Sequence, residues 1–324
     1  MPNLENSNEK SLLNGNNVYK SSFKSMSELA EEGRNQKPLA KVFGNYILAN
    51  NFVNFVSERG VGKTWYELQL CLAISSRQDS FCNEPLEFHG NTILINCELS
   101  EYIMKQRLTK LFQNPPFKIN QSEFQAYVYT TRHSWDVELK KIKELIEKYK
   151  PVVVFLDNFR MAFLQADSSN NRDVAQIMNQ LLILKDTYNL ALVVTDHTKK
   201  NTRTLLTESD LQTGAGAKSD LADGDMFLRK SSQNQSYRVL KRAKSRNCEE
   251  QQGAKLLLFN QETLWFEFLA DGINEEDHLG NGVITQTEDK IELAKELKDK
   301  GRSYDQIAQL LNVSKSMAYR WLNN

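Results

Sequence analysis

Apolar and polar positions along residues 41–270 alternate between two patterns. Continuous apolar or β-prone runs, which are typical of buried strands, cover residues 52–56, 91–97, 128–131, 151–157 and 190–195. Apolar residues recur at helical spacing in a stretch that begins near Lys63 and in residues 100–112, 135–149 and 174–188. This repeated strand–helix alternation predicts an α/β fold with a mostly parallel central sheet.

The pattern changes toward the C-terminal end of this region. Short strand-like runs at 226–228, 237–241, 255–259 and 264–268 predict an antiparallel finish to the sheet. Residues 202–222 are polar and contain glycine, which predicts a loop, and residues 271–287 have the composition of a linker. At the other end, residues 1–24 predict a mobile tail, and residues 26–33 predict a short helix that ends at Gly33.

The last 37 residues have a purely helical pattern. Helices are predicted over 288–300, 303–311 and 315–322, with Gly301 ending the first and with Ser303 and Ser314 as N-caps of the others. Two short helices across a tight turn predict a helix-turn-helix, and a helical hairpin that packs on the rest of the chain is the alternative. Its expected core consists of Ile307, Ala308, Leu311, Val313, Ala318 and Leu322.

These patterns divide the 324-residue chain into four parts. We expect a tail and lead-in helix at 1–40, an α/β domain at 41–270, a linker at 271–287 and a small all-α domain at 288–324. The 41 basic and 41 acidic residues balance, so the overall charge indicates no partner, and a nucleic-acid site would need local clusters. Four scattered cysteines, no signal peptide and no membrane-spanning run predict a cytoplasmic protein without a membrane partner.

Residues 57–64, Ser-Glu-Arg-Gly-Val-Gly-Lys-Thr, connect a predicted strand to a predicted helix. This is the context of a Walker A motif, in which backbone N–H groups and a helix N-terminus hold phosphates. Lys63 is expected to reach the β- and γ-phosphates of a nucleotide, and Thr64 to bind Mg²⁺. The first position of the motif is normally glycine, and this chain has Ser57 there. The substitution leaves the Gly-x-Gly-Lys-Thr part of the motif intact. The predicted nucleotide contacts are Ser57, Glu58, Arg59, Gly60, Val61, Gly62, Lys63, Thr64 and Trp65.

Three further polar residues follow predicted strands, at the sheet edge where ligands of α/β folds bind. Asp157 ends the most apolar run and is expected to contact Mg²⁺ opposite Thr64, as a Walker B aspartate does. Glu98 could orient and deprotonate an attacking water, or simply favour a helix N-terminus. His197 could detect the terminal phosphate, or serve as a structural donor.

Basic residues cluster in three places. Lys199, Lys200 and Arg203 follow His197 and either face nucleic acid or form a solvated loop. Lys244 and Arg246 end a strand-like run, where they either reach a phosphate at a neighbouring subunit or form an exposed strand end. In the last predicted helix, Lys315, Ser316, Tyr319 and Arg320 are placed to contact duplex DNA.

Taken together, these motifs resemble the RecA-type motor core of hexameric helicases, and most closely that of RepA-like plasmid replicative helicases, with DnaB-type helicases as cousins. The resemblance spans about residues 26–270. It rests on the order of residues 57–64, Glu98, Asp157, 196–200, 214–220 and 244–246. The C-terminal unit resembles helix-turn-helix domains of the resolvase and sigma-factor type.

The resemblance implies a RecA-like P-loop fold and a homo-hexameric ring with ATP and Mg²⁺ between subunits. It implies Glu98 as catalytic base, His197 as phosphate sensor, and Lys244 and Arg246 as fingers into the adjacent site. It also implies that the loops of residues 199–218, which include Lys218, grip single-stranded DNA. Those loops lack an aromatic residue for base stacking, so contacts to the sugar-phosphate backbone of the DNA would have to suffice.

The sequence favours an ATP-driven motor on DNA, carried by a plasmid or mobile element. A nucleotide-controlled DNA-binding regulator or assembly factor without unwinding activity is the alternative. A small-molecule P-loop kinase is a third hypothesis, against which the Lys244–Arg246 segment and the C-terminal helices argue.

Overall fold

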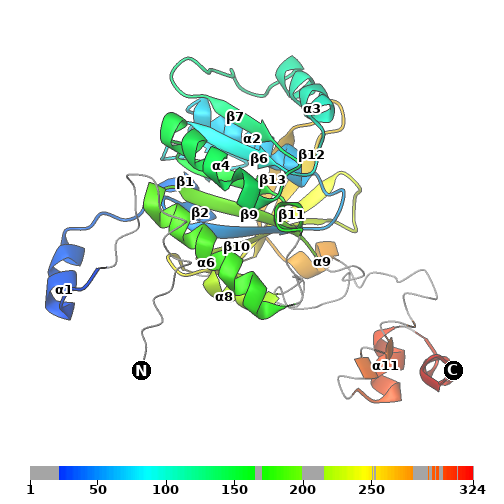
Figure 1. Ribbon diagram of the computed structural model, residues 1–324. Helices are drawn as coiled ribbons and strands as arrows, with labels where there is room; N and C mark the ends of the chain where they lie inside the picture. Colours follow the sequence, from blue (N-terminus) through cyan, green and yellow to red (C-terminus); the bar gives the residue numbers. More distant parts are fainter. Residues whose placement is uncertain are drawn as a thin grey trace.

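The computed structural model describes residues 22–164, 170–198, 215–249, 251 and 253–279, together with 291, 294–295, 297–298, 302–311 and 313–323 of the C-terminal part. Its main feature is a nine-stranded sheet with the order β13-β12-β11-β10-β3-β9-β8-β6-β7 (Figure 1). The parallel strands are β3 (Phe52–Ser57), β6 (Thr92–Asn96), β7 (Ala126–Thr130), β8 (Val153–Asp157), β9 (Ala191–His197) and β10 (Gly224–Lys230). The antiparallel strands are β11 (Tyr237–Ser245), β12 (Ala254–Phe259) and β13 (Phe266–Ile273). The predicted α/β fold with a mostly parallel sheet is confirmed.

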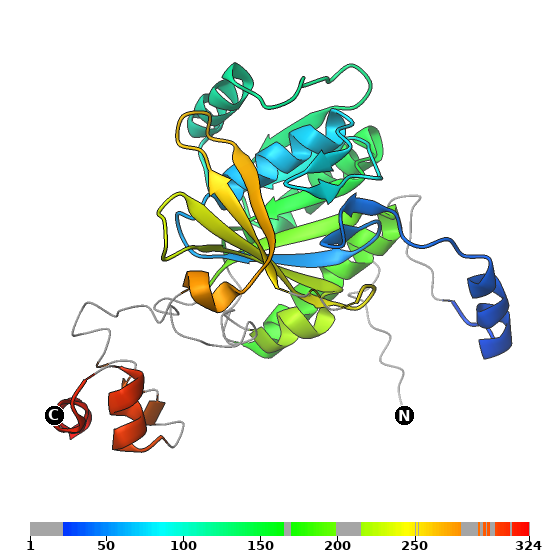
Figure 2. The same cartoon turned by 180° about the vertical axis from the view of Figure 1, so that it is seen from behind.

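Helices cover both faces of this sheet. On one face lies α2 (Lys63–Ser75), and on the other lie α4 (Trp135–Tyr149) and α6 (Asn171–Tyr188) (Figures 1 and 2). Each face has its own apolar core, and β3 contributes to both because Val53 and Phe55 face α2 while Phe52 faces the other side. The central strands are buried on both faces, which explains their unbroken apolar runs.

Smaller elements complete this part of the chain. They are α1 (Met26–Arg34), α3 (Glu101–Gln113), α5 (Phe159–Ala162) and the two-stranded pairs β1 (Lys41–Phe43) with β2 (Ile47–Leu48) and β4 (Ser80–Phe81) with β5 (Glu84–Pro85). Ser100 caps α3 as predicted, because its hydroxyl accepts from Ile103 N at 3.3 Å. No helix among the described residues is both long and apolar enough to span a bilayer.

Two segments that were predicted to be irregular, the loop at 202–222 and the linker at 271–287, contain regular structure in part. Residues 215–221 of the predicted loop form helix α8 (Ala215–Leu221), while 202–214 lie outside the described residues. Helix α8 packs along α6 and is bonded to the sheet through the buried side chain of Asn54, whose Nδ2 donates to Lys218 O at 3.1 Å. Tertiary contacts therefore order a segment whose glycines disfavour a helix.

The predicted linker also begins with ordered structure. Strand β13 continues to Ile273, and α9 (Glu275–Leu279) follows. His278 of α9 is buried, and its Nδ1 lies 3.1 Å from Ser231 Oγ. The antiparallel part of the sheet begins at β11 and not at β10 as predicted, because β10 runs parallel to β3.

The C-terminal part contains α11 (Tyr304–Leu310) and α12 (Lys315–Asn323). Ser303 and Ser314 act as the expected N-caps: Ser303 Oγ accepts from Gln306 N at 3.3 Å and Ser314 Oγ from Met317 N at 3.2 Å. The predicted core is confirmed, since Ile307, Ala308, Leu311 and Ala318 are buried with Val313 and Leu322 packed against them. Its assignment as a helix-turn-helix that reads DNA stays a prediction.

Candidate nucleotide-binding site

The loop between β3 and α2 is shaped for an anion. Gly60 and Gly62 have positive φ values of +68° and +104°, which glycine adopts without the strain that a side chain would cause. Gly62 is the N-cap of α2 and makes no side-chain capping bond, so the first N–H groups of the helix are available to a ligand. A Cβ at Gly62 would lie 3.1 Å from the ring of Phe266, so a larger residue would also press against that ring.

Lys63, Thr64 and Asp157 meet at this loop. The Thr64 hydroxyl donates to Asp157 Oδ2 at 2.7 Å, and Lys63 Nζ lies 3.4 Å from Asp157 Oδ1. Asp157 Oδ1 also accepts from Thr195 Oγ1 at 3.0 Å, which fixes the carboxylate. Lys63 is only 5% exposed, and its ammonium makes no hydrogen bond to the described residues.

These residues fit ATP and Mg²⁺. A buried ammonium without a hydrogen-bond acceptor is suited to a phosphate oxygen, and a hydroxyl beside a carboxylate offers the oxygen ligands that Mg²⁺ prefers. Lys63 and the loop N–H groups would hold the phosphates, and Thr64 and Asp157 would hold the ion. A bound Mg²⁺ would neutralise charge that develops on the phosphates.

Glu98 follows β6 and lies at the same sheet edge as the loop. Its Oε2 accepts from Asn158 Nδ2 at 2.5 Å and lies 3.8 Å from His197 Nε2. The His197 imidazole, assisted by the charge of Lys63 and by Asn158, lowers the pKa of Glu98 to about 2 although partial burial opposes this. The carboxylate is therefore ionised at neutral pH and, at 42% exposure, open to a water molecule.

His197 ends β9 and is mostly buried, with Nδ1 unpaired among the described residues. The structure thus brings Lys63, Thr64, Glu98, Asp157 and His197 together at one edge of the sheet. This arrangement can hold a triphosphate, place an ionised carboxylate near it, and sense the ligand through the imidazole.

The other loop residues have distinct surroundings. Ser57 is buried, its Oγ is unpaired among the described residues, and its carbonyl accepts from Thr198 N at 3.0 Å. Glu58 lies 3.8 Å from Arg229, while Arg59 is exposed and Val61 is buried.

Arg107 on α3 was missed by the sequence reasoning. Its guanidinium lies 5.1 Å from the ring centre of Trp65, the residue after Thr64. Burial lowers the pKa of Arg107, while the negative charges of Asp157 and Glu98 act in the opposite direction. Arg107 is therefore close enough to these two carboxylates to interact with them electrostatically. The only signal in the sequence was a basic residue on the helix that follows Glu98.

Two more residues beside the site were also missed. Arg132 Nη1 donates to Cys97 O at 3.2 Å and to Glu98 O at 2.6 Å, so it fixes the backbone that carries Glu98. Glu67 lies one helical turn after Lys63 on α2, fully buried, with both carboxyl oxygens unpaired among the described residues. Burial, and then the charge of Asp157, raise the pKa of Glu67 well above its ordinary value. A helical spacing of four from Lys63 could have signalled that Glu67 faces the same way.

Lys244 and Arg246 lie near the N-terminal ends of the parallel strands β3 and β10, whereas the nucleotide loop follows the C-terminal end of β3. Arg246 N donates to Asp223 O at 2.8 Å, and Asp223 N donates to the carbonyl of Phe52, the first residue of β3. The nucleotide loop follows the last residue of β3, Ser57, about 17 Å away for five extended residues. Lys244 Nζ and Arg246 Nη2 donate to the carbonyls of Ser219 and Asp220 near the C-terminus of α8.

Of the residues expected to contact single-stranded DNA, the structure describes Lys218. Lys199, Lys200 and Arg203 lie outside the described residues. Lys218 is 3% exposed; its ammonium pairs with Asp196 and lies 4.0 Å from the ring centre of Phe159. The structure therefore places Lys218 in the interior, where it bonds β9 to α8, and a DNA contact does not fit this position.

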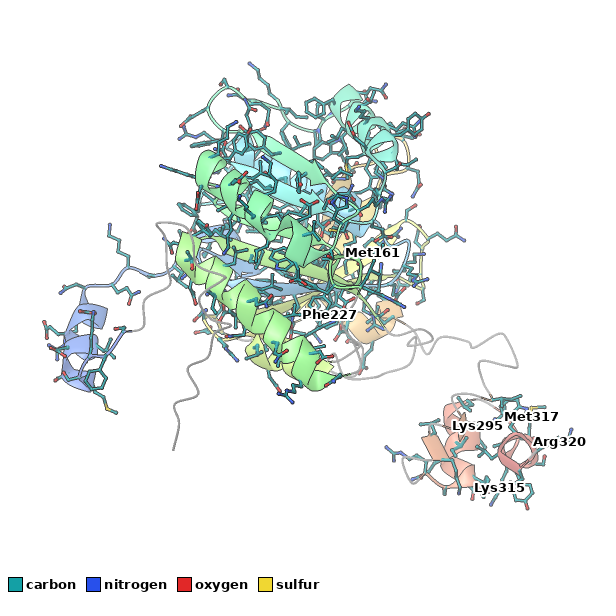
Figure 3. The ribbon with its side chains drawn as sticks, in the orientation of Figure 1. Met161, Phe227, Lys295, Lys315, Met317 and Arg320 are labelled. Carbon is teal, nitrogen blue, oxygen red and sulfur yellow. The ribbon has the colours of Figure 1, made fainter. Side chains whose placement is uncertain are left out.

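The predicted duplex-binding residues share the exposed side of α12. Lys315, Ser316, Tyr319 and Arg320 are all exposed, and Figure 3 labels Lys315 and Arg320 on this unit. Lys315 Nζ pairs with Asp305 Oδ2 at 2.7 Å. One of the two predicted basic contacts is thus already partly neutralised.

Comparison with known proteins supports the interpretation of the loop. A family model described as an AAA domain matches residues 19–203, which is more than half of the chain and includes the loop, Glu98, Asp157 and His197. No curated protein matches the sequence. The chain belongs to the AAA-domain family and has the nucleotide site of a P-loop ATPase.

Proposed function

We propose that this P-loop ATPase is a ring-forming motor of the RecA-like helicase type that acts on DNA, with a RepA-like replicative helicase as its specific form. The ring is a homo-hexamer with ATP and Mg²⁺ at each subunit interface. Glu98 activates the attacking water, and His197 reports the state of the terminal phosphate to the segment that follows β9.

The observation that carries this proposal is the position of Lys244 and Arg246. Both lie at the end of the sheet opposite their own nucleotide loop, so neither can complete the site of its own chain. Arg246 is 49% exposed and can turn outward. Cations that stabilise phosphoryl transfer can be supplied by a neighbour, and this placement suits that role.

Single-stranded DNA would pass the segment that contains Lys199, Lys200 and Arg203. It begins directly after His197, so a change at the phosphate sensor has a short covalent path to the DNA contact. Duplex DNA would meet the exposed side of α12. The basic and acidic residues of the predicted unit nearly balance, so several copies in a ring would supply the affinity that one copy lacks.

The test compares ATPase rates with and without single-stranded DNA and measures strand displacement with the same preparation. The motor requires that DNA stimulates hydrolysis and that ATP drives strand separation. DNA-independent hydrolysis without strand separation contradicts the motor and favours the nucleotide-controlled regulator.

A mixing experiment tests the shared sites. Lys63→Ala disables a subunit's own site, and Arg246→Ala disables the site of its neighbour. Each variant alone should be inactive, and mixed rings should recover part of the activity because some interfaces then hold Lys63 and Arg246 together. Mass photometry with a non-hydrolysable nucleotide gives the subunit number. Absence of recovery at every ratio, in rings of confirmed mixed composition, argues against shared sites.

A further inference from the structure

Arg238 of β11 is a buried cation with neutral partners. It is 4% exposed, and its Nε donates to the carbonyl of Val61 in the nucleotide loop at 2.7 Å. Its Nη1 donates to Gln235 O at 2.6 Å and to Tyr237 O at 2.8 Å. Burying a guanidinium is costly, and among the described residues the hydrogen-bond partners of Arg238 are backbone carbonyls, with the negative charge of Glu58 acting on it without a salt-bridge contact.

The strand order brings this residue to the loop. Arg238 pairs in register with Lys230, the last residue of β10, and β10 runs parallel to β3, so both residues lie at the edge where the loop begins. Lys230 itself borders the loop, since a Cβ at Gly60 would lie 3.6 Å from its Nζ. The ring of Phe259 lies 5.8 Å from the Arg238 guanidinium.

The bond to Val61 has a geometric consequence for the loop. In a trans peptide the C=O and the following N–H point in opposite directions. A Val61 carbonyl that is held toward Arg238 therefore turns the N–H of Gly62 away from Arg238. Gly62, with its positive φ, is the N-cap from which α2 starts, so this N–H belongs to the group that would face a phosphate.

We propose that Arg238 is a positioning residue for the phosphate-binding loop. It holds the Val61 carbonyl outside the loop, which presents the Gly62 N–H to the ligand, and it adds a fixed positive charge in a region of low dielectric. The antiparallel end of the sheet thereby takes part in nucleotide binding without touching the nucleotide. This inference rests on nucleotide binding at residues 57–64, which is part of the proposed function.

Three variants test the proposal. Arg238→Met removes the donors and the charge, while Arg238→Lys keeps the charge and one donor group. Arg242→Met is the matched control, because Arg242 lies on the same strand, is 8% exposed, and also donates to backbone carbonyls, those of Asn45 and Glu249, away from the loop. For each protein, calorimetry gives the Kd for ADP and for a non-hydrolysable ATP analogue, and a melting curve without nucleotide gives Tm.

We expect Arg238→Met to weaken binding of the ATP analogue at least tenfold and Arg238→Lys to recover part of that loss. Arg242→Met should lower Tm comparably and leave Kd within threefold of wild type. Equal weakening by Arg238→Met and Arg242→Met, or no weakening by Arg238→Met, overturns the proposal. If Arg238→Met does not fold, Arg238→Lys decides: weakening of at least threefold supports the proposal, and a smaller effect overturns it. Wild-type protein that binds neither nucleotide contradicts the proposed function itself.

Discussion

Glu67 should make the stability of the free protein depend on pH, and Glu67→Gln should remove that dependence. The folded state buries Glu67 between α2 and the sheet, close to the charge of Asp157, and its carboxyl oxygens are unpaired among the described residues. Burial and the charge of Asp157 raise its pKa, so the folded state binds a proton that the unfolded state releases above about pH 4.5. Stability therefore falls as the pH rises from that value toward the folded pKa.

The size of the effect follows from linkage. One extra proton bound by the folded state gives a slope of at most about 1.4 kcal/mol per pH unit. Between pH 5.5 and 7.5 the wild type should thus lose up to ~2.7 kcal/mol relative to Glu67→Gln. At about 2 °C per kcal/mol for a large domain, the two Tm values should diverge by roughly 5 °C.

The assay is urea unfolding and thermal melting at several pH values, in EDTA and without nucleotide. Glu101→Gln serves as the control, because Glu101 is 70% exposed on α3 and its pKa is lowered by Lys105, which confines its effect to pH values below about 4.5. A wild type that parallels Glu67→Gln over the whole range would show that Glu67 carries no proton in the fold, and the reasoning from its burial would be refuted.

Three further changes have defined outcomes. Glu98→Gln should slow ATP hydrolysis at least 100-fold because the base is lost, with the Kd for a non-hydrolysable analogue within threefold of wild type; a large loss of binding would contradict a catalytic role. Lys218→Met should cost about 3 kcal/mol in urea unfolding because it leaves the mostly buried Asp196 carboxylate without its cation, and adding Asp196→Asn should recover most of this; a loss below about 1 kcal/mol would contradict a stabilising ion pair. Ala318→Asp should abolish hydrogen-exchange protection in residues 302–323, because Ala318 is fully buried there, while protection in β3 stays unchanged.

The sequence by itself determined the order and type of most elements. Strand and helix periods are local, and so are the caps at Ser100, Ser303 and Ser314 and the glycines of the nucleotide loop. Most of the small core around Ala318 was also predictable, because the whole core forms within 29 residues of chain, from Ala294 to Leu322. These features were predictable because each depends on residues that lie close together in the sequence.

Only the tertiary structure decided which charged residues meet. The order of the strands brings Arg238 to the carbonyl of Val61, 177 positions away in the sequence, and places Lys244 and Arg246 at the far end of the sheet. Lys218 stands in a polar, glycine-containing segment, yet its ammonium is buried against Asp196. Hydrophobic periodicity gives the face on which a residue lies, but the pairing of distant strands sets its partner, and that pairing depends on the packing of the whole domain.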